Sequence, residues 1–295
     1  MIKDYIVLTK FVLSFAVSLS AVLAYVMASG QIGIDTLISY FAVLLIALGV
    51  STLNQVQEYK EDALMERTKH RPIACGKISP MTGIIIGSVH IIIALGLIYW
   101  LLGLTGLNLF LFAFIWYNGF YTPLKKKSAL AVVPGALLGV VPPAIGWLAA
   151  ARAYPDAGIF LWSPEFYSLG IFFFIWQIPH FWLLVMLHYG DYAGAGYPTA
   201  MRLFGRVSLQ KLTFVWLVIT IQAGYFMVSI FDPMSTTILV LLAITAVLGF
   251  ISSTQLLKKS FELKDARKVF IEINIAFLFS LILISIDEVL KHAAL

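Results

Sequence analysis

The segment IDTLISYFAVLLIALGVSTLNQVQEYKEDALMERTKHRP, residues 34–72, joins a long apolar run to the most charged stretch of the chain. Residues 34–53 can cross a bilayer as a helix, because about 18 or more predominantly apolar residues suffice for a span. Residues 54–72 hold nine charged or histidine side chains, although only 12% of the whole chain is charged. The contrast predicts a transmembrane helix that leads into a polar loop of carboxylates and cations.

Apolar runs of this length recur along the chain of 295 residues, which is 61% hydrophobic and has a mean hydropathy of +0.94. Soluble domains are about half apolar and about a quarter charged. Nine membrane spans are predicted at roughly residues 11–28, 34–53, 82–102, 104–121, 130–150, 166–187, 212–231, 235–255 and 269–290. The sequence therefore predicts an all-α, polytopic protein of the lipid bilayer, and no polar linker divides residues 1–295 into separate domains.

Two details of this assignment leave alternatives. The first span could be the apolar part of a signal peptide, but its apolar run of about 18 residues exceeds the usual 7–15, so we expect a retained helix. The link between the third and fourth spans, at Gly103, is very short.

The basic residues alternate between the predicted loops. Eighteen of the 20 lie in the N-terminal segment or in the loops after the second, fourth, sixth and eighth spans, and the other two are Arg152 and Lys291. Cytoplasmic loops carry an excess of Lys and Arg. The alternation therefore predicts a cytoplasmic N-terminus and an external C-terminus in the cell (inner) membrane. The net charge of +5 follows from this topology, and nothing in the sequence indicates a nucleic-acid partner.

Three oxygen-bearing side chains follow the second span at intervals of four residues: Asn54, Glu58 and Asp62. If the helix continues beyond residue 53, they lie along one face. Mg²⁺ is usually held by one or two carboxylates together with substrate phosphates, so this face is a candidate metal site. The spacing alone fits equally well a solvated loop whose charges only set the topology.

Three basic side chains come directly after this acidic face, at Arg67, Lys69 and Arg71. Guanidinium and ammonium groups bind phosphate oxygens through charge-assisted hydrogen bonds. Carboxylates for a metal beside cations for phosphate are the arrangement that a diphosphate needs.

Further polar residues lie on the same predicted side of the membrane. The segment YTPLKKKS (121–128) places Lys125 and Lys126 after the fourth span, and HYGDYAGAGYP (188–198) places Asp191 after the sixth. The segment WQIPHFW (176–182) places His180 beside Pro179, eleven residues before Asp191, so His180 and Asp191 could share a helix face. Membrane anchoring or packing explains each feature alone. Together they predict a pocket with an anionic head group at its mouth and an apolar chain inside.

These segments resemble the UbiA superfamily of intramembrane prenyltransferases. MERTKHRP (65–72), after an acidic helix that begins with Asn, is similar to the first motif of that superfamily. Five segments, YTPLKKKS, VPPAIGW, WQIPHFW, DYAGAGYP and ARKVF, resemble one branch of it, the protoheme IX farnesyltransferases or heme O synthases. The resemblance implies about nine transmembrane helices in a UbiA-like bundle around a central cavity.

The resemblance also implies a reaction and its site. Farnesyl diphosphate would ionise with the help of Mg²⁺, a vinyl group of protoheme IX would capture the allylic cation, and water would add to give heme O. The implied catalytic residues are Asn54, Glu58, Asp62 and Asp191, and the last three are the implied metal ligands. The implied substrate-binding residues are Arg67, Lys69, Arg71, Lys125, Lys126 and His180. Among these, His180 would ligate or orient the heme. Heme A synthase or a terminal oxidase is the implied partner.

The chain departs from the pattern of that branch at three places. Glu58 stands where the first motif usually has Asp, and Thr199-Ala200-Met201 stands where Met-Leu-Pro is usual. Tyr189 and Gly190 stand where a basic residue and another Asp usually precede Asp191, which leaves the number of Mg²⁺ ions open. The alternatives are a UbiA-type prenyltransferase with a quinone or chlorin acceptor, and a transporter with charged gates. The second predicts polar residues deep in several spans, and the spans carry few.

Overall fold

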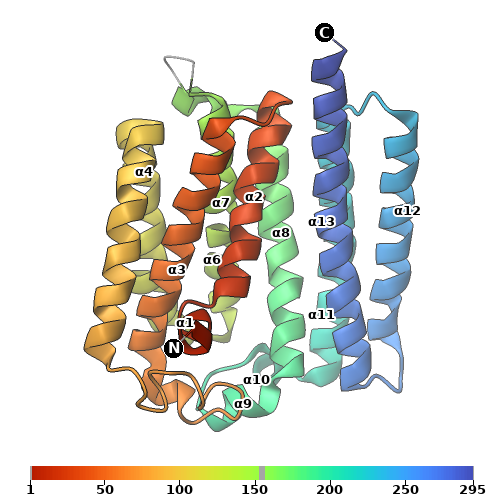
Figure 1. The fold of residues 1–295 in the computed structure, drawn as a ribbon. Coiled ribbons are helices and arrows are strands. Elements are labelled where there is room, and N and C mark those ends of the chain that lie inside the picture. The colour runs from red at the N-terminus through yellow and green to blue at the C-terminus, as the bar shows by residue number, and fades with distance from the viewer. Residues whose placement is uncertain (1, 153–156, 295) are drawn as a thin grey trace.

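The computed structural model describes residues 2–152 and 157–294, which form a bundle of long helices (Figure 1). The α-helices are α1 (Ile2–Leu8), α2 (Phe11–Ser29), α3 (Ile34–Asp62), α4 (Pro80–Phe114), α5 (Thr122–Lys125), α6 (Val132–Ala136), α7 (Val141–Ala150), α8 (Pro164–Leu187), α9 (Tyr189–Gly194), α10 (Ala200–Phe204), α11 (Arg206–Phe231), α12 (Thr236–Ser253) and α13 (Leu263–Ala293). A π-helix (Ile115–Tyr121) joins α4 to α5, and 3₁₀ segments lie at Ala129–Ala131, Leu137–Val140, Ala157–Trp162 and Thr254–Leu257. Within these residues there is no β-strand, so the all-α prediction is confirmed.

Eight helical stretches of the described chain are long and apolar enough to cross a membrane, as expected for an integral multi-pass protein. One of them, Pro80–Lys125, contains two predicted spans. Gly103 inside it has φ 56° and ψ −140°, a backbone conformation that favours glycine. A Cβ on Gly106 would lie 2.6 Å from Ile98 Cγ2, whereas residues eight apart in a continuous helix are separated by about 12 Å. The chain therefore turns back at Gly103, which divides this stretch into the two helices that the sequence predicted.

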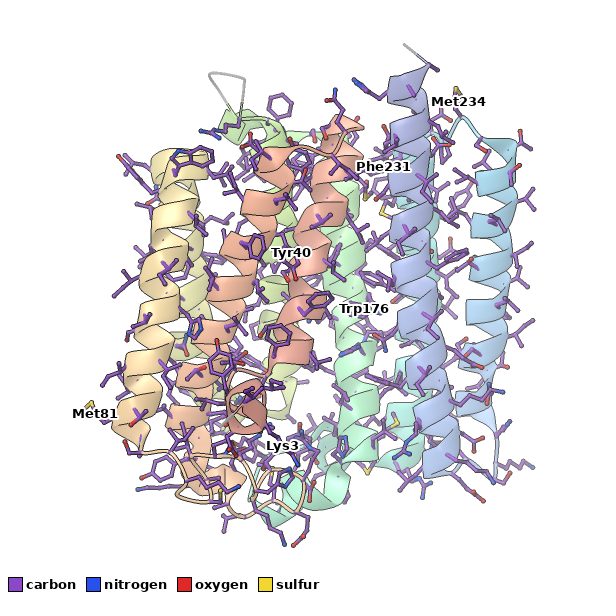
Figure 2. All side chains as sticks on the ribbon, in the orientation of Figure 1. Lys3, Tyr40, Met81, Trp176, Phe231 and Met234 are labelled. Carbon is purple, nitrogen blue, oxygen red and sulfur yellow. The ribbon has the colours of Figure 1, made fainter. Side chains whose placement is uncertain are left out.

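The loops divide between two ends of the bundle. Side-chain contacts join helix ends and loops at one end of the bundle through the pairs Lys77–Asp4, Lys126–Glu61 and Arg206–Phe261. At the other end they join the pairs Arg152–Asp35 and Lys291–Phe231. Figure 2 shows Lys3 and Met81 at the first end and Phe231 and Met234 at the second. The first end, called the basic end below, is where the sequence places its basic loops.

The fifth crossing is not a single regular helix. It consists of α6, a 3₁₀ turn and α7, and prolines lie where these pieces begin or bend. Gly146 on α7 lies so close to α2 that a Cβ there would be 1.9 Å from the Ala21 carbonyl oxygen. A Cβ on Gly139 would be 1.7 Å from Gln177 Oε1 on α8. These close approaches hold the broken crossing between α2 and α8, where it lines the interior.

Candidate active site

A cavity of about 800 Å³ lies inside the bundle. Its walls are formed by α2, α3, α4 with the π-helix, the broken fifth crossing, α8 and α13. Apolar and aromatic side chains line its interior, among them Val43, Phe110, Ile145, Phe173 and Phe277. Charged side chains line the part at the basic end. The cavity therefore combines a polar mouth with an apolar interior, as the sequence predicted.

The acidic face of the cavity mouth is a continuation of a membrane-spanning helix. Helix α3 runs unbroken to Asp62, nine residues beyond the predicted span, so Asn54, Glu58 and Asp62 lie on one face. All three are buried, at 1%, 6% and 4% exposure, and all three line the cavity. The conditional prediction of a continuing helix is confirmed, and the reading of these residues as a solvated loop is wrong.

Each buried carboxylate has its own cation. Glu58 Oε1 lies 2.7 Å from Lys125 Nζ, and Asp62 receives two hydrogen bonds from Arg71 Nη1, at 2.8 and 2.7 Å. The hydroxyl of Tyr197 donates to Glu58 at 3.3 Å. Buried ion pairs add little net stability because desolvation offsets their attraction. If Lys125 and Arg71 turned to a phosphate, the two buried carboxylates would therefore need another cation, such as a metal ion, in their place.

The predicted basic residues divide into two groups. Arg67, Arg71 and Lys125 line the cavity. Lys69 pairs with Glu66 on the surface, and Lys126 pairs with Glu61 at 2.5 Å. Neither Lys69 nor Lys126 lines the cavity. Of the six predicted substrate-binding residues, the three cations Arg67, Arg71 and Lys125 thus lie at the cavity mouth. His180 lies deeper in the same cavity.

Asp191 stands apart from the first acidic face. Its Oδ1 accepts a hydrogen bond from the backbone N–H of Glu66 at 3.2 Å, and its side chain does not line the cavity. Helix α8 ends at Leu187, and His188 interrupts the helix with φ −122° before α9 begins. The prediction that His180 and Asp191 share a helix face is therefore wrong.

His180 lies inside α8, which runs through Pro179 as one helix. Its Nδ1 is 2.9 Å from Asn274 Oδ1 on α13. The imidazole lies among the rings of Trp176, Phe181 and Phe270, with ring centroids 4.7, 5.6 and 4.9 Å away. His180 is thus held in an aromatic part of the cavity, away from the ion pairs.

Lys10 is a site residue that the sequence did not single out. It lines the cavity from the turn between α1 and α2, with φ 48°, and its Nζ donates to Asn54 Oδ1 at 3.1 Å. Burial, together with the nearby charges of Arg71 and Lys125, lowers the pKa of Lys10 to about 7. The only signal in the sequence is the position of Lys10 just before the first span. That position does not indicate a site residue, because the excess of basic residues on the cytoplasmic side accounts for it equally well.

Tyr197 and Asn274 were missed for the same reason, since nothing in their local sequence distinguishes them. Burial, and then the negative charges of Glu58 and Glu61, raise the pKa of Tyr197. Its hydroxyl therefore keeps the proton that it donates to Glu58. Asn274 was seen only as one of a few polar residues inside a span.

The oxygen donors at the cavity mouth suit one kind of metal site. In the described part of the chain, no three His, Cys, Asp or Glu side chains converge closely enough to form a protein-only metal site. Glu58 and Asp62, one turn apart on α3 and both facing the cavity, are the one or two carboxylates that Mg²⁺ takes when phosphates complete its shell. The residues therefore fit Mg²⁺ bound together with a diphosphate.

Comparison with known proteins identifies relatives of this arrangement. A model of the UbiA prenyltransferase family matches residues 16–281. A protoheme IX farnesyltransferase from Oleidesulfovibrio alaskensis is 37% identical over 191 residues, which are 65% of each chain. Another from Nitratidesulfovibrio vulgaris is 33% identical over 220 residues, covering 73% of this chain and 72% of the relative. The matches thus span about two thirds of the length of these relatives.

A solved structure shares the fold. A UbiA homologue from Archaeoglobus fulgidus, bound to GPP and Mg²⁺, superposes with a TM-score of 0.67 at 14% sequence identity. The match covers 96% of this chain and 99% of the homologue. The predicted UbiA-like bundle is therefore confirmed.

Proposed function

The chain belongs to the UbiA prenyltransferase family, and we propose that it transfers a farnesyl group from farnesyl diphosphate to a vinyl group of protoheme IX. Water adds in the same conversion, and the products are heme O and diphosphate. The proposal rests on the match to protoheme IX farnesyltransferases and on the cavity, whose charged mouth suits a diphosphate and whose apolar interior suits a prenyl chain. The alternative acceptors, a quinone or a chlorin, become outcomes of the test below.

The charge balance at the mouth supports binding of an anion. Glu58 and Asp62 face three cations, Lys10, Arg71 and Lys125. When Lys10 is protonated the cluster carries one excess positive charge, and when Lys10 is neutral the cluster is balanced. The site is shielded from water, so electrostatic interactions there are stronger than in bulk solvent. A diphosphate satisfies this excess, and Arg67 at the same wall adds a further cation.

We propose that Glu58 and Asp62 hold Mg²⁺ and that Asp191 joins them when substrate is bound. When bound, Mg²⁺ would neutralise the charge that develops on the leaving diphosphate. Arg71 and Lys125 would move from the carboxylates to the phosphate oxygens. The side chain of Asn54, whose Nδ2 is buried and has no hydrogen-bond partner among the described residues, would donate to the same group. Lys69 and Lys126, as surface cations, would draw the substrate to the mouth.

The bond changes follow from these positions. The C1–O bond of farnesyl diphosphate breaks, and both electrons leave with the diphosphate. The π electrons of the vinyl group form the new bond to C1, and the remaining cation, stabilised by the porphyrin, takes up water and releases a proton. The apolar walls delay water until the vinyl carbon is in place. Tyr117 and Tyr121 line the path, and their ring faces can stabilise the allylic cation.

The orientation in the membrane is part of the proposal. The basic end would face the cytoplasm of the cell (inner) membrane, with the cavity mouth opening there and the C-terminus outside. Cysteine labelling at Lys60 and Lys264 should then report the cytoplasm, and labelling at Lys291 the far side. Heme A synthase or a terminal oxidase as the consumer of the product is proposed from the family alone.

Pigment extraction tests the function directly. Membranes from cells that express the chain, supplied with farnesyl diphosphate, should yield a heme whose mass has increased by one farnesyl group and one hydroxyl group. A farnesylated quinone or chlorin without farnesylated heme would reassign the acceptor. Purified protein with each acceptor in turn, and with Mg²⁺ removed by chelation, completes the assignment.

A further inference from the structure

We propose that Asn274 is a positioning residue: it fixes His180 in the Nδ1–H tautomer and thereby presents the Nε2 lone pair to the iron of the acceptor. The inference deepens the proposed function and rests on it. Asn274 lies on α13 and belongs to no sequence motif. The atom of His180 that would bind the iron is Nε2.

The first step is the orientation of the Asn274 amide. Its Nδ2 donates to the backbone carbonyl oxygen of Phe270, one turn earlier on α13. A carbonyl oxygen only accepts hydrogen bonds, so the amide nitrogen must face Phe270. The amide oxygen then faces the opposite way, and it lies 2.9 Å from His180 Nδ1. The helix backbone thus decides which end of the amide meets the imidazole.

The second step is the tautomer of His180. An amide oxygen has no proton to give, so the hydrogen in this contact belongs to Nδ1. In a neutral imidazole, one ring nitrogen is the donor and the other is the acceptor. The lone pair therefore sits on Nε2, for which the described residues supply no hydrogen-bond partner. His180 thus holds a free acceptor atom among aromatic side chains in a cavity that Gln177 and Asn274 also line.

The third step is the fixed direction of the ring. Trp176 and Phe270 lie within 5 Å of the imidazole centroid, and Trp176 is itself stacked on Phe277 at 4.0 Å. His180 and Asn274 both line the cavity. Turning the imidazole would break the bond to Asn274 and disturb this stack. The ring is thus preorganised with a flat aromatic wall beside it, which suits a macrocycle.

These features match what a metal-binding histidine needs. Histidines that bind metals usually donate their second N–H to an oxygen acceptor, which fixes the tautomer and raises the basicity of the ligand atom. Imidazole is also the common axial ligand of heme iron. A purely structural role is the rival, because polar side chains also form hydrogen bonds between packed membrane helices. The rival predicts no change in heme spectra when the acceptor is altered.

The test uses four variants of the full chain in detergent, one of which, His180→Ala, removes the proposed ligand itself. Asn274→Leu removes the acceptor, Asn274→Asp keeps an acceptor in the same place, and Asn108→Ala removes an exposed amide on α4 as the matched control. Ferric protoheme IX is titrated while the Soret band is followed, and the reduction potential of the bound iron is measured. Binding of farnesyl diphosphate is measured in parallel.

The proposal predicts a specific pattern. Asn274→Leu should weaken heme binding by about 10- to 100-fold, the usual cost of losing an outer-shell partner of a metal ligand, and should shift the Soret band. Asn274→Asp should bind heme like the parent and lower the reduction potential, because a carboxylate makes the imidazole a stronger donor. Asn108→Ala should match the parent in every measurement.

Two results would overturn the inference while leaving the proposed function intact. One is an Asn274→Leu variant with the parent's Soret band and affinity, when His180→Ala loses heme. The other is an Asn274→Asp variant that loses heme as completely as Asn274→Leu, since the acceptor is then not what matters. If the parent binds farnesyl diphosphate but no heme, the proposed function itself fails. Retained farnesyl diphosphate binding in each variant shows that the bundle is folded.

Discussion

The two acidic segments at the basic end differ in how the chain holds them. Glu58 and Asp62 extend from the long helix α3, are buried, and face cations inside the cavity. Asp191 sits on α9, a helix of six residues after the break at His188. The Asp191 side chain is partly exposed, and it accepts a hydrogen bond from a backbone N–H outside the cavity. The first segment is part of a long helix packed in the bundle, whereas the second is a short helix whose carboxylate lies outside the cavity wall.

A carboxylate motif can therefore be present without being preorganised. A site held by packed helices keeps its geometry before the substrate arrives, and this is where electrostatic stabilisation is most effective. Asp191 would have to leave its bond to Glu66 before it could reach a metal ion at α3. We therefore expect the reaction to depend strongly on the α3 face and weakly on Asp191.

The largest effect is expected from Asp62→Asn. This change keeps the size of the side chain and one acceptor for Arg71, but it removes a charge from the proposed metal site. Turnover should fall by about 100- to 1,000-fold, as when a preorganised electrostatic group is lost. The measurement is formation of farnesylated heme with Mg²⁺ at limiting and saturating concentrations.

Glu61→Gln is the matched control for Asp62→Asn. It lies one position earlier on the same helix, pairs with Lys126, and does not line the cavity. Its turnover should stay near that of the parent. Equal losses in the two variants would contradict the distinction between the buried face and its surroundings.

A smaller effect, about 100-fold in kcat/KM, is expected from Lys125→Met, because one charge-assisted contact to the phosphates is removed. Lys126→Met, at the next position, should lose less than about fivefold, because an exposed cation contributes little. Steady-state kinetics with farnesyl diphosphate varied would check both. A larger loss in Lys126→Met would indicate that the diphosphate binds near the Lys126–Glu61 pair and not at the cavity mouth.

Lys10→Met should reduce affinity for the diphosphate by about tenfold near pH 7, equivalent to about 1.4 kcal/mol. The pKa of Lys10 lies at about 7 because burial, Arg71 and Lys125 disfavour its charge. Above that pH the free protein holds a neutral amine, and a bound anion favours the ammonium form. Binding at pH 8 should therefore take up a proton, and affinity should fall as the pH rises from 7 to 9.

Calorimetry at pH 8, in two buffers with different heats of ionisation, measures this uptake with a non-reacting thiolo analogue of farnesyl diphosphate. The parent should take up protons and Lys10→Met should not. Identical uptake in both proteins would assign the proton to another group. The variant's affinity should also become nearly independent of pH over this range.

The fold was predictable from the sequence to the extent that hydrophobic length and basic loops determine it. Those signals predicted nine crossings, including the pair around Gly103, and they placed Asn54, Glu58 and Asp62 on one face. Hydrophobic length and basic loops do not predict which individual side chains contact one another. The break at His188 separates Asp191 from the face of His180, and no propensity in HYGDY predicts it. Lys10 and Asn274 enter the site only because α2 and α13 pack beside α3 and α8.

Of the two acidic segments, the second should matter less, so Asp191→Asn should reduce turnover less than Asp62→Asn. The amide oxygen still accepts from the Glu66 N–H, so the link between the two segments survives while the charge is lost. If Asp191 serves the metal only after substrate binds, turnover at saturating Mg²⁺ should fall by less than about tenfold, a smaller loss than that of a preorganised group. The concentration of Mg²⁺ needed for half-maximal rate should rise instead. Turnover of Asp191→Asn and Asp62→Asn, measured as a function of Mg²⁺ concentration, shows whether Asp191 acts only after substrate binds or belongs to the same preorganised site as Asp62. A loss at Asp191 as large as that at Asp62, and not relieved by added Mg²⁺, would mean that both acidic segments act as one site and that α9 closes over the cavity during the reaction.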